Sequence, residues 1–175
     1  STLIHHILNG SNRNVQIGGN IGTPLFDLSP TNIVETTVIE LSSYQIEVAK
    51  LLIPDIAVFL NFSPDHLDRH GGIGGYFSAK RRLFKSNQNQ ISVVGVDEKE
   101  GLAITSDLRS RKGNQVIKIS TKINLTHDEQ SVFSDGRNLF ECKLGKIVNK
   151  LDITNLAGLP GNHNLQNICA AYAVC

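Results

Sequence analysis

The chain has 175 residues, 40% of them hydrophobic, which is enough apolar material for the core of one compact domain. The formal net charge is only +1, so no overall field attracts nucleic acid or an anionic membrane surface. We therefore expect a single domain that binds neither, and any anionic ligand must be held by a local site.

The cysteines and the chain ends indicate a setting for this domain. Cys142, Cys169 and Cys175 have neither metal-ligand spacing nor the even count of a disulfide framework. No apolar stretch approaches the roughly 20 residues that cross a bilayer, and the start lacks a signal-peptide pattern. Both ends fall inside helical patterns. We expect a soluble, cytoplasmic protein of which this chain is a fragment.

Short apolar runs alternate with helical patterns along most of the chain. The predicted strands cover 15–19, 36–41, 56–62, 91–96 and 116–120. The predicted helices cover 2–9, 43–53, 74–86 and 98–108, followed by edge hairpins at 130–153 and a last helix after "LPGNHNLQN". The run "IAVFLNF" lacks polar alternation, as in a strand covered on both faces. The predicted fold class is α/β, with a mostly parallel central sheet covered by helices on both faces and a small antiparallel edge.

Three polar or glycine-rich stretches directly follow predicted strands. They are "GGNIG" at 18–22, "ELSS" at 40–43 and "NFSPDHLDRH" at 61–70. In open α/β sheets, ligands bind beyond the carboxyl ends of the strands, where helix amino ends also point. We therefore expect a ligand site at this edge, although the glycine cluster alone is weak evidence because it lacks the Lys-Ser/Thr of a phosphate-binding loop.

Glu40 ends a strand that we expect to be buried, where an unpaired carboxylate is costly. A divalent cation that bridges Glu40 to phosphate oxygens would remove this cost. The alternative is a surface glutamate, and Ser42 with Gln45 also fits a helix capping box. Similarly, the Asp and His residues of "SPDHLDRH" suit either metal binding or an ordinary turn.

Lys80 falls within an apolar stripe of its predicted helix. At 100° per residue it shares a face with Tyr76, Leu83 and Phe84, and Phe77 lies at the border. One interpretation is a lysine stem that covers the core and lifts its ammonium into water. The other is a lysine that faces the active cleft, either as a cation for phosphate or, after carbamylation, as a carboxylate for metal.

Five stretches resemble, in order and spacing, the central ATP-binding domain of the Mur ligases of bacterial cell-wall synthesis. The stretches are "GGNIGTPL", "ELSSYQIE", "LNFSPDHLDRH", "YFSAKRRLF" and "LPGNHNLQN", and together they span nearly the whole chain. "ELSSYQ" and "GGNIG" favour the D-glutamate-adding branch of the family. The resemblance implies a P-loop-type fold for residues 1–175 and, outside this chain, an N-terminal domain that binds uridine and a C-terminal domain that binds the amino acid.

The resemblance also implies site residues. Glu40 would ligate the Mg²⁺ on the ATP phosphates, His66 would ligate a second Mg²⁺, and Lys80, carbamylated, would support that second site; the catalytic residues would be Lys80 and His66. Asn20, Ser42 and Gln45 would contact the UDP-muramoyl-alanine substrate, with Tyr76 close by. Asn164 and Asn167 would contact the adenine end of ATP.

The implied reaction is an ATP-dependent ligation in peptidoglycan synthesis. A carboxylate of UDP-N-acetylmuramoyl-L-alanine would attack the γ-phosphoryl group of ATP, and the amino group of D-glutamate would then displace phosphate to form an amide. Mg²⁺ and cationic groups would shield the two anions that meet. We expect a monomer, and we expect the isolated 175 residues, without the phosphate-loop lysine and the other domains, to be inactive.

Three alternatives stay open from the sequence. The first is another ligase of the same superfamily, such as folylpolyglutamate synthase, with a different acyl substrate. The second is a nucleotide-binding module without catalysis. The third is a metallohydrolase built on "DHLDRH", which would bind zinc tightly.

Overall fold

The computed structural model describes residues 1–30, 33–63, 67–85, 89–111, 113–156 and 161–175. The chain divides into two units, Ser1–Lys50 together with Cys175, and Leu51–Val174. Each unit is described by itself. Across the described ranges, no helix has both the length and the apolarity to cross a membrane.

The first unit is built around a pair of parallel strands. Its elements are α1 (Thr2–Gly10), β1 (Val15–Gly19), the 3-10 turn η1 (Leu25–Asp27), β2 (Thr36–Glu40) and α2 (Ser43–Val48). The two strands pair over their full length, so that Gly19 lies opposite Glu40. Both strands therefore end at the same edge, and the segments that follow them start side by side.

Two expectations for this part of the chain were wrong in detail. The strands β1 and β2 form a two-stranded sheet of their own rather than joining β3 in one hydrogen-bonded sheet. The helix predicted over 43–53 ends at Val48. Val48 and Leu51 are almost fully exposed, so the apolar run has no packed face to support a longer helix, and Pro54 disfavours helical backbone at residue 53.

The second unit contains the larger sheet. Its elements are β3 (Ile56–Phe59), α3 (Leu67–His70), α4 (Ile73–Arg81), β4 (Ile91–Gly95), α5 (Lys99–Arg109), β5 (Gln115–Ser120), β6 (Gln130–Ser134), β7 (Asn138–Lys143), β8 (Lys146–Asp152) and α6 (Asn162–Val174). The six strands follow one another in the order β3-β4-β5-β6-β7-β8. Strands β3 to β6 are parallel, and β7 and β8 add the predicted antiparallel edge.

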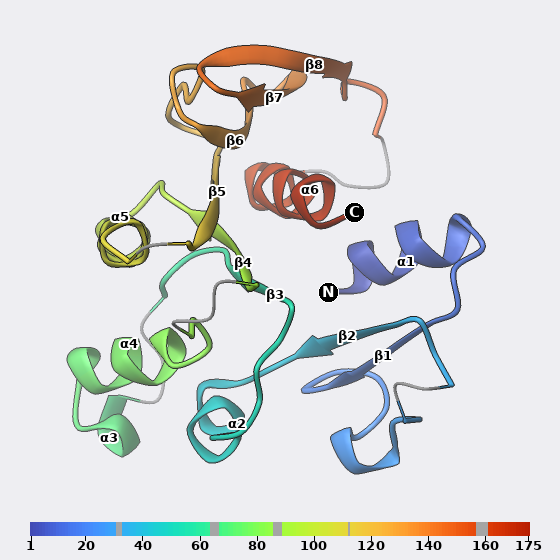
Figure 1. The fold of residues 1–175 in the computed structure, drawn as a ribbon, viewed down its shortest axis with the longest axis vertical. Coiled ribbons are helices and arrows are strands. Elements are labelled where there is room, and N and C mark those ends of the chain that lie inside the picture. The colour runs from blue at the N-terminus through green and yellow to red at the C-terminus, as the bar shows by residue number, and fades with distance from the viewer. Residues whose placement is uncertain (31–32, 64–66, 86–88, 112, 157–160) are drawn as a thin grey trace. The chain divides into compact units, whose positions relative to one another are not determined.

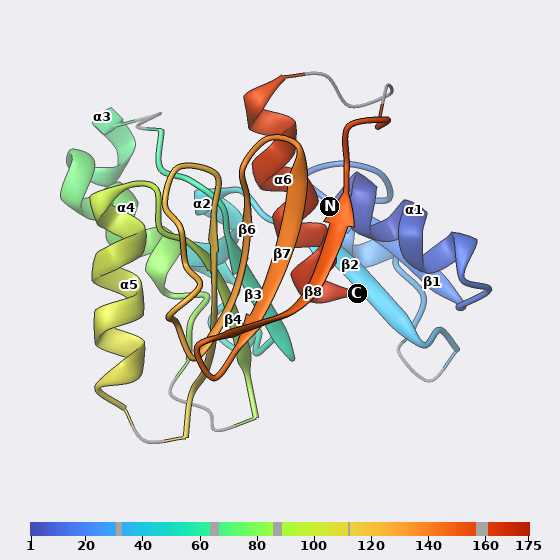
Figure 2. The same ribbon diagram turned by 90° about the horizontal axis from the view of Figure 1, so that it is seen from above.

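Helices cover both faces of this sheet. Figure 1 shows α4 and α5 on one side of the strands and α6 on the other, and Figure 2 shows the same arrangement from above. On the first face, Phe59 and Val94 pack against Ile104 and Leu108 of α5. On the second face, the thiol of Cys169 on α6 lies 3.9 Å from the Ser120 carbonyl oxygen. Burial of one such large apolar side chain stabilises the fold by about 1.5–3 kcal/mol. The mostly parallel sheet with helices on both faces confirms the predicted α/β class.

Candidate active site

The backbone brings Asn20 and Glu40 together at the carboxyl ends of β1 and β2. The Asn20 amide donates a 2.8 Å hydrogen bond to the Glu40 carbonyl oxygen. Gly19 makes this approach possible, because it has a φ of +106° and a Cβ there would lie 2.2 Å from that same oxygen. The glycines of "GGNIG" therefore have a structural role in closing the turn against β2.

The Glu40 side chain has a hydroxyl partner that sequence reasoning did not assign. The Ser1 hydroxyl, at the start of α1, donates a hydrogen bond to Glu40 Oε2. The two residues are 39 positions apart, so no local pattern indicates the contact. Hydroxyl and carboxylate oxygens are both hard ligands of the kind that Mg²⁺ accepts.

Ser42 and Gln45 form the predicted capping box at the start of α2. The Ser42 hydroxyl accepts a hydrogen bond from the Gln45 amide at 3.3 Å, and Gln45 Oε1 accepts one from the Ser42 amide at 2.9 Å. These bonds satisfy two backbone donors and fix both side chains beside the end of β2. Their contact with substrate stays a prediction.

Lys80 projects from α4 over an aromatic cluster. Its ammonium lies 5.0 Å from the ring centroid of Tyr76. The Tyr76 ring is buried and lies 5.3 Å from the ring of Phe62 and 5.4 Å from that of His70. The predicted apolar stripe is confirmed, since Tyr76 and Phe84 belong to the core of this unit. Lys80 itself is half-buried.

The helix that carries Lys80 is tied to α5 by an ion-pair network. Asp107 accepts from both Arg81 and Arg111, each at 2.6 Å. Partial burial opposes ionisation of Asp107, but the hydrogen bonds and charges of the two arginines outweigh it and hold the pKa of that carboxyl below its usual value. The network therefore fixes the end of α4 while the carboxylate is ionised.

His66, the predicted ligand of a second metal, lies outside the described residues, as does Asp65. Within the described ranges, no group of three His, Cys, Asp or Glu side chains is placed to hold a metal ion. A site for Mg²⁺ does not need one, because Mg²⁺ keeps several waters and binds through one or two carboxylates plus substrate phosphates. Glu40 with Ser1 fits that kind of partial site.

Asn164 and Asn167 lie together in the first turns of α6. Asn167 Nδ2 donates a 3.2 Å hydrogen bond to Asn164 Oδ1, and the Asn164 amide donates to the Gly161 carbonyl oxygen at 3.0 Å. Both side chains are half-buried. Their contact with adenine stays a prediction.

The thiol of Cys169 is buried within the second unit. Burial, together with the nearby charge of Asp97, raises the pKa of this thiol to about 12. It therefore remains protonated at neutral pH, and a protonated, buried thiol is not a nucleophile.

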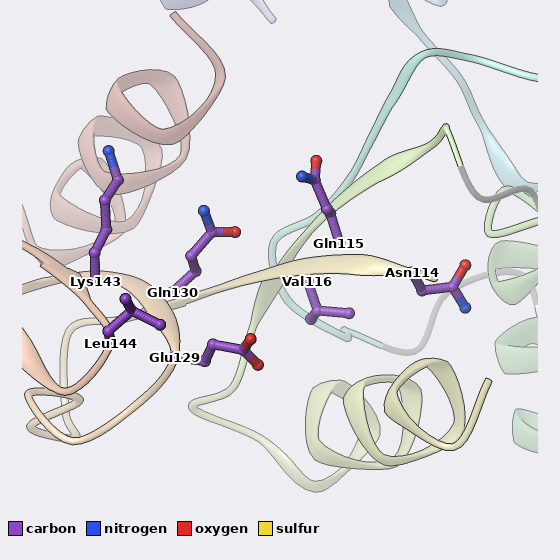
Figure 3. A pocket seen from close by; sticks show the side chains of 7 residues that line it. All are labelled: Asn114, Gln115, Val116, Glu129, Gln130, Lys143 and Leu144. Atoms are coloured by element: carbon purple, nitrogen blue, oxygen red, sulfur yellow. The ribbon is translucent and has the colours of Figure 1, made fainter. Parts of the chain in front are cut away.

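A hollow of about 370 Å³ lies at the end of the larger sheet where β5 and β6 start (Figure 3). It is formed where β5 and β6 begin and β7 ends. The lining residues are Asn114, Gln115, Val116, Glu129, Gln130, Lys143 and Leu144. Ligands of parallel sheets bind at the carboxyl ends of the strands, and this hollow lies at the amino ends of β5 and β6. It contains none of the predicted site residues.

The family model described as "Mur ligase middle domain" matches residues 1–175. A relative from Ruegeria pomeroyi, named UDP-N-acetylmuramoylalanine--D-glutamate ligase, is 48% identical over 176 aligned positions, which cover all of this chain. The chain spans 38% of that relative's length.

Two solved structures resemble the fold. One, described as the structure of UDP-N-acetylmuramoyl-L-alanyl-D-glutamate--2,6-diaminopimelate ligase, superposes with a TM-score of 0.71 at 20% identity over 99% of this chain and 39% of its own. The other, a mutant of L. casei FPGS, gives a TM-score of 0.63 at 12% identity over 98% of this chain and 53% of its own. At these identities the likeness bears on the fold alone.

The capping box predicts a specific loss of stability. We expect Ser42→Ala to lower the free energy of unfolding by about 1 kcal/mol, because α2 loses the side-chain acceptor for its first turn. Ser42→Asp should restore most of this loss, since aspartate also caps helices. Urea unfolding would measure both changes.

The matched control is Ser78→Ala, an exposed serine within α4, where alanine should cost nothing. Equal unfolding midpoints for Ser42→Ala and the parent protein would contradict the role of the cap.

Proposed function

The chain belongs to the Mur ligase family, and from this premise we propose that it is the central, ATP-binding domain of a ligase that adds D-glutamate to UDP-N-acetylmuramoyl-L-alanine. The observation that carries the proposal is the 48% identity to a relative of that name, which extends over the whole chain. The pairing of Asn20 with Glu40 at one strand edge supports it. We assign uridine and D-glutamate binding to the parts of the relatives that this chain does not match.

In the proposed reaction, a carboxylate oxygen of the muramoyl-alanine substrate attacks the γ-phosphorus of ATP, and the bond to the ADP oxygen breaks. The amino group of D-glutamate then attacks the acyl carbon of the resulting acyl phosphate. Inorganic phosphate leaves, the nitrogen loses a proton, and an amide is formed. Both steps bring negatively charged groups together, so the protein must supply compensating charge.

Glu40, with His66 and a carbamylated Lys80 for a second ion, would hold Mg²⁺. When bound, Mg²⁺ neutralises charge on the phosphate oxygens and orients them for in-line transfer. The hydroxyl of Ser1 keeps the Glu40 carboxylate in one orientation, which supports a preformed metal ligand.

Lys80 would act after its amine has combined with carbon dioxide and released a proton. The product carries a negative charge in place of a positive one and adds two oxygen ligands. The position of Lys80 supports this role, because its side-chain nitrogen lies over the buried ring of Tyr76, which packs against Phe62 in the segment that follows β3.

The remaining predicted residues divide between two substrates. Asn20, Ser42 and Gln45, with Tyr76 nearby, would orient the muramoyl-alanine substrate, and Asn164 with Asn167 would meet the adenine end of ATP. We place this enzyme in the cytoplasm as a monomer that acts in peptidoglycan synthesis, where the UDP-linked substrate is available.

A second candidate is a ligase that extends a different acyl substrate, as in folylpolyglutamate synthesis. L. casei FPGS shares the fold, with a TM-score of 0.63, but that likeness bears on the fold alone and does not favour this acyl substrate. The identity to that protein is only 12%, against 48% for the D-glutamate ligase, so the muramoyl substrate is better supported.

Turnover of the full-length protein tests the proposal. With ATP, Mg²⁺ and UDP-N-acetylmuramoyl-L-alanine, we expect phosphate release only when D-glutamate is present, and little with L-glutamate or a folate donor. Glu40→Gln should lower kcat by about 100-fold, because it removes a charged metal ligand.

The control is Glu35→Gln. Glu35 is exposed and directly precedes the first residue of β2, so this substitution should leave turnover unchanged. Turnover with a folate donor and none with the muramoyl substrate would support the second candidate and refute the first.

Carbamylation of Lys80 gives a separate prediction. Lys80→Ala should abolish most ligation, and acetate or formate should restore part of it, because a small carboxylate can occupy the place of the carbamate. A ¹³C resonance from labelled bicarbonate should be seen by NMR in the parent protein and be missing from the variant. Arg82→Ala, an exposed cation that ends the same helix, should behave as the parent does.

A Lys80→Ala protein with normal turnover would contradict any role for this lysine. If the ¹³C NMR spectra of both proteins with labelled bicarbonate lack a carbamate resonance, carbamylation is refuted, and Lys80 can act only as a cation.

A further inference from the structure

Gln166 is a buried polar residue, 8% exposed, on α6 between the predicted nucleotide contacts Asn164 and Asn167. Its side chain bridges to the end of β3, where Nε2 donates to the Leu60 carbonyl oxygen at 3.0 Å. Its Oε1 accepts from Asn61 Nδ2 at 2.9 Å, across 105 positions of sequence. One side chain thus joins the first turns of α6 to the carboxyl end of β3, the outermost parallel strand of the larger sheet.

The end of β4 is shaped to admit this bridge. A Cβ on Gly95 would lie 1.9 Å from the Leu60 carbonyl oxygen and 3.1 Å from Gln166 Nε2. Any larger residue at Gly95 would therefore separate the two partners. The glycine leaves room for the glutamine amide at the point where β3 and β4 both end.

The segment after β3 is fastened by a second bond. The Phe62 amide donates to a carboxylate oxygen of Glu98 at 2.8 Å. Asn61 therefore stands between two fixed points, Leu60 held by Gln166 and Phe62 held by Glu98. These bonds hold the backbone from Leu60 to Phe62.

The need of the Leu60 carbonyl oxygen for a donor explains only half of the bridge. Leu60 is half-buried, and a backbone acceptor that is shielded from water is costly to leave without a donor. The Asn61 side chain has no such need, since it is exposed and water would serve it equally well. The bond from Asn61 to Gln166 therefore orders a surface side chain at the edge where ligands of such sheets bind.

We propose that Gln166 is a positioning residue for the nucleotide site, which holds the adenine-facing turns of α6 in register with the carboxyl end of β3. The inference rests on the proposed function, because it takes α6 and the strand ends to be two sides of one ATP site. Gln166 does not touch the reacting atoms. It acts through Asn61 and through the helix that carries Asn164 and Asn167.

Direct nucleotide binding by the full-length protein tests this role. With a fluorescent ATP analogue and Mg²⁺, we expect Gln166→Leu to weaken binding by about 10-fold, the scale of lost supporting contacts around bound groups. In ligation kinetics the KM for ATP should rise by a similar factor, whereas the KM for D-glutamate should stay the same. A general loss of stability would not separate the two substrates in this way.

The chain offers a matched control in Gln90, which is 1% exposed. It lies just before β4, at the amino ends of the strands and so at the opposite end of the sheet from Gln166. Its side chain donates to the Pro54 carbonyl oxygen at 2.9 Å and accepts from the Lys85 amide at 2.9 Å. Gln90→Leu should lower the melting temperature at least as much as Gln166→Leu. It should leave nucleotide affinity within about twofold of the parent, because it supports no ligand edge.

Asn61→Ala keeps the test decisive if Gln166→Leu fails to fold. It removes only the bond from an exposed side chain, and we expect it to weaken nucleotide binding by about threefold, a smaller effect in the same direction. Parent-like nucleotide affinity in Asn61→Ala, or in a folded Gln166→Leu, would overturn the inference. If the parent protein binds nucleotide but catalyses no ligation, the proposed function is refuted. The nucleotide affinities of the variants still test the role of Gln166 in that case.

Discussion

The parallel pairing of β1 with β2 sets the geometry on which the proposed site depends. Because Gly19 lies opposite Glu40, both strands end at one edge and the two following segments start in contact. The Asn20 amide then bonds to the Glu40 carbonyl oxygen, an approach that only a residue without a Cβ permits at Gly19. Two polar residues of the proposed site are thus placed by backbone, at no cost in side-chain entropy.

The second unit holds its candidate residues by a different means. Its strands β3 to β6 are also parallel, but side-chain hydrogen bonds rather than backbone pairing hold the segment that follows β3. Gln166 and Glu98 fasten the end of β3, and Asp107 ties the helix of Lys80 to α5. Each of these groups is partly or fully buried, where a hydrogen bond that is lost leaves an unsatisfied partner. The candidate residues of this unit therefore project from segments that are hydrogen-bonded to the rest of the unit without substrate.

Local patterns in the sequence predicted most of the fold. The runs at 91–96 and 116–120 were assigned correctly because apolar, β-branched stretches of that length form buried strands. The capping box of Ser42 and Gln45 was also visible, since its partners are three residues apart. The helix over 43–53 was too long because its extent depends on packing that propensity does not report, and a separate two-stranded sheet cannot be read from strand patterns. The bonds from Ser1 to Glu40 and from Asn61 to Gln166 join residues 39 and 105 positions apart, so no spacing rule could indicate them.

The central proposal is that Glu40, at the end of β2, binds the Mg²⁺ of a magnesium–triphosphate group. A crystal structure of the full-length protein with Mg²⁺ and a non-hydrolysable ATP analogue would test it most directly. The account predicts a carboxylate oxygen of Glu40 at about 2.1 Å from a Mg²⁺ ion that also contacts phosphate oxygens. It further predicts Lys80 and Asn164 in the same pocket, at opposite ends of the nucleotide. A bound nucleotide whose Mg²⁺ does not contact Glu40, or which lies away from Lys80 and Asn164, would contradict it.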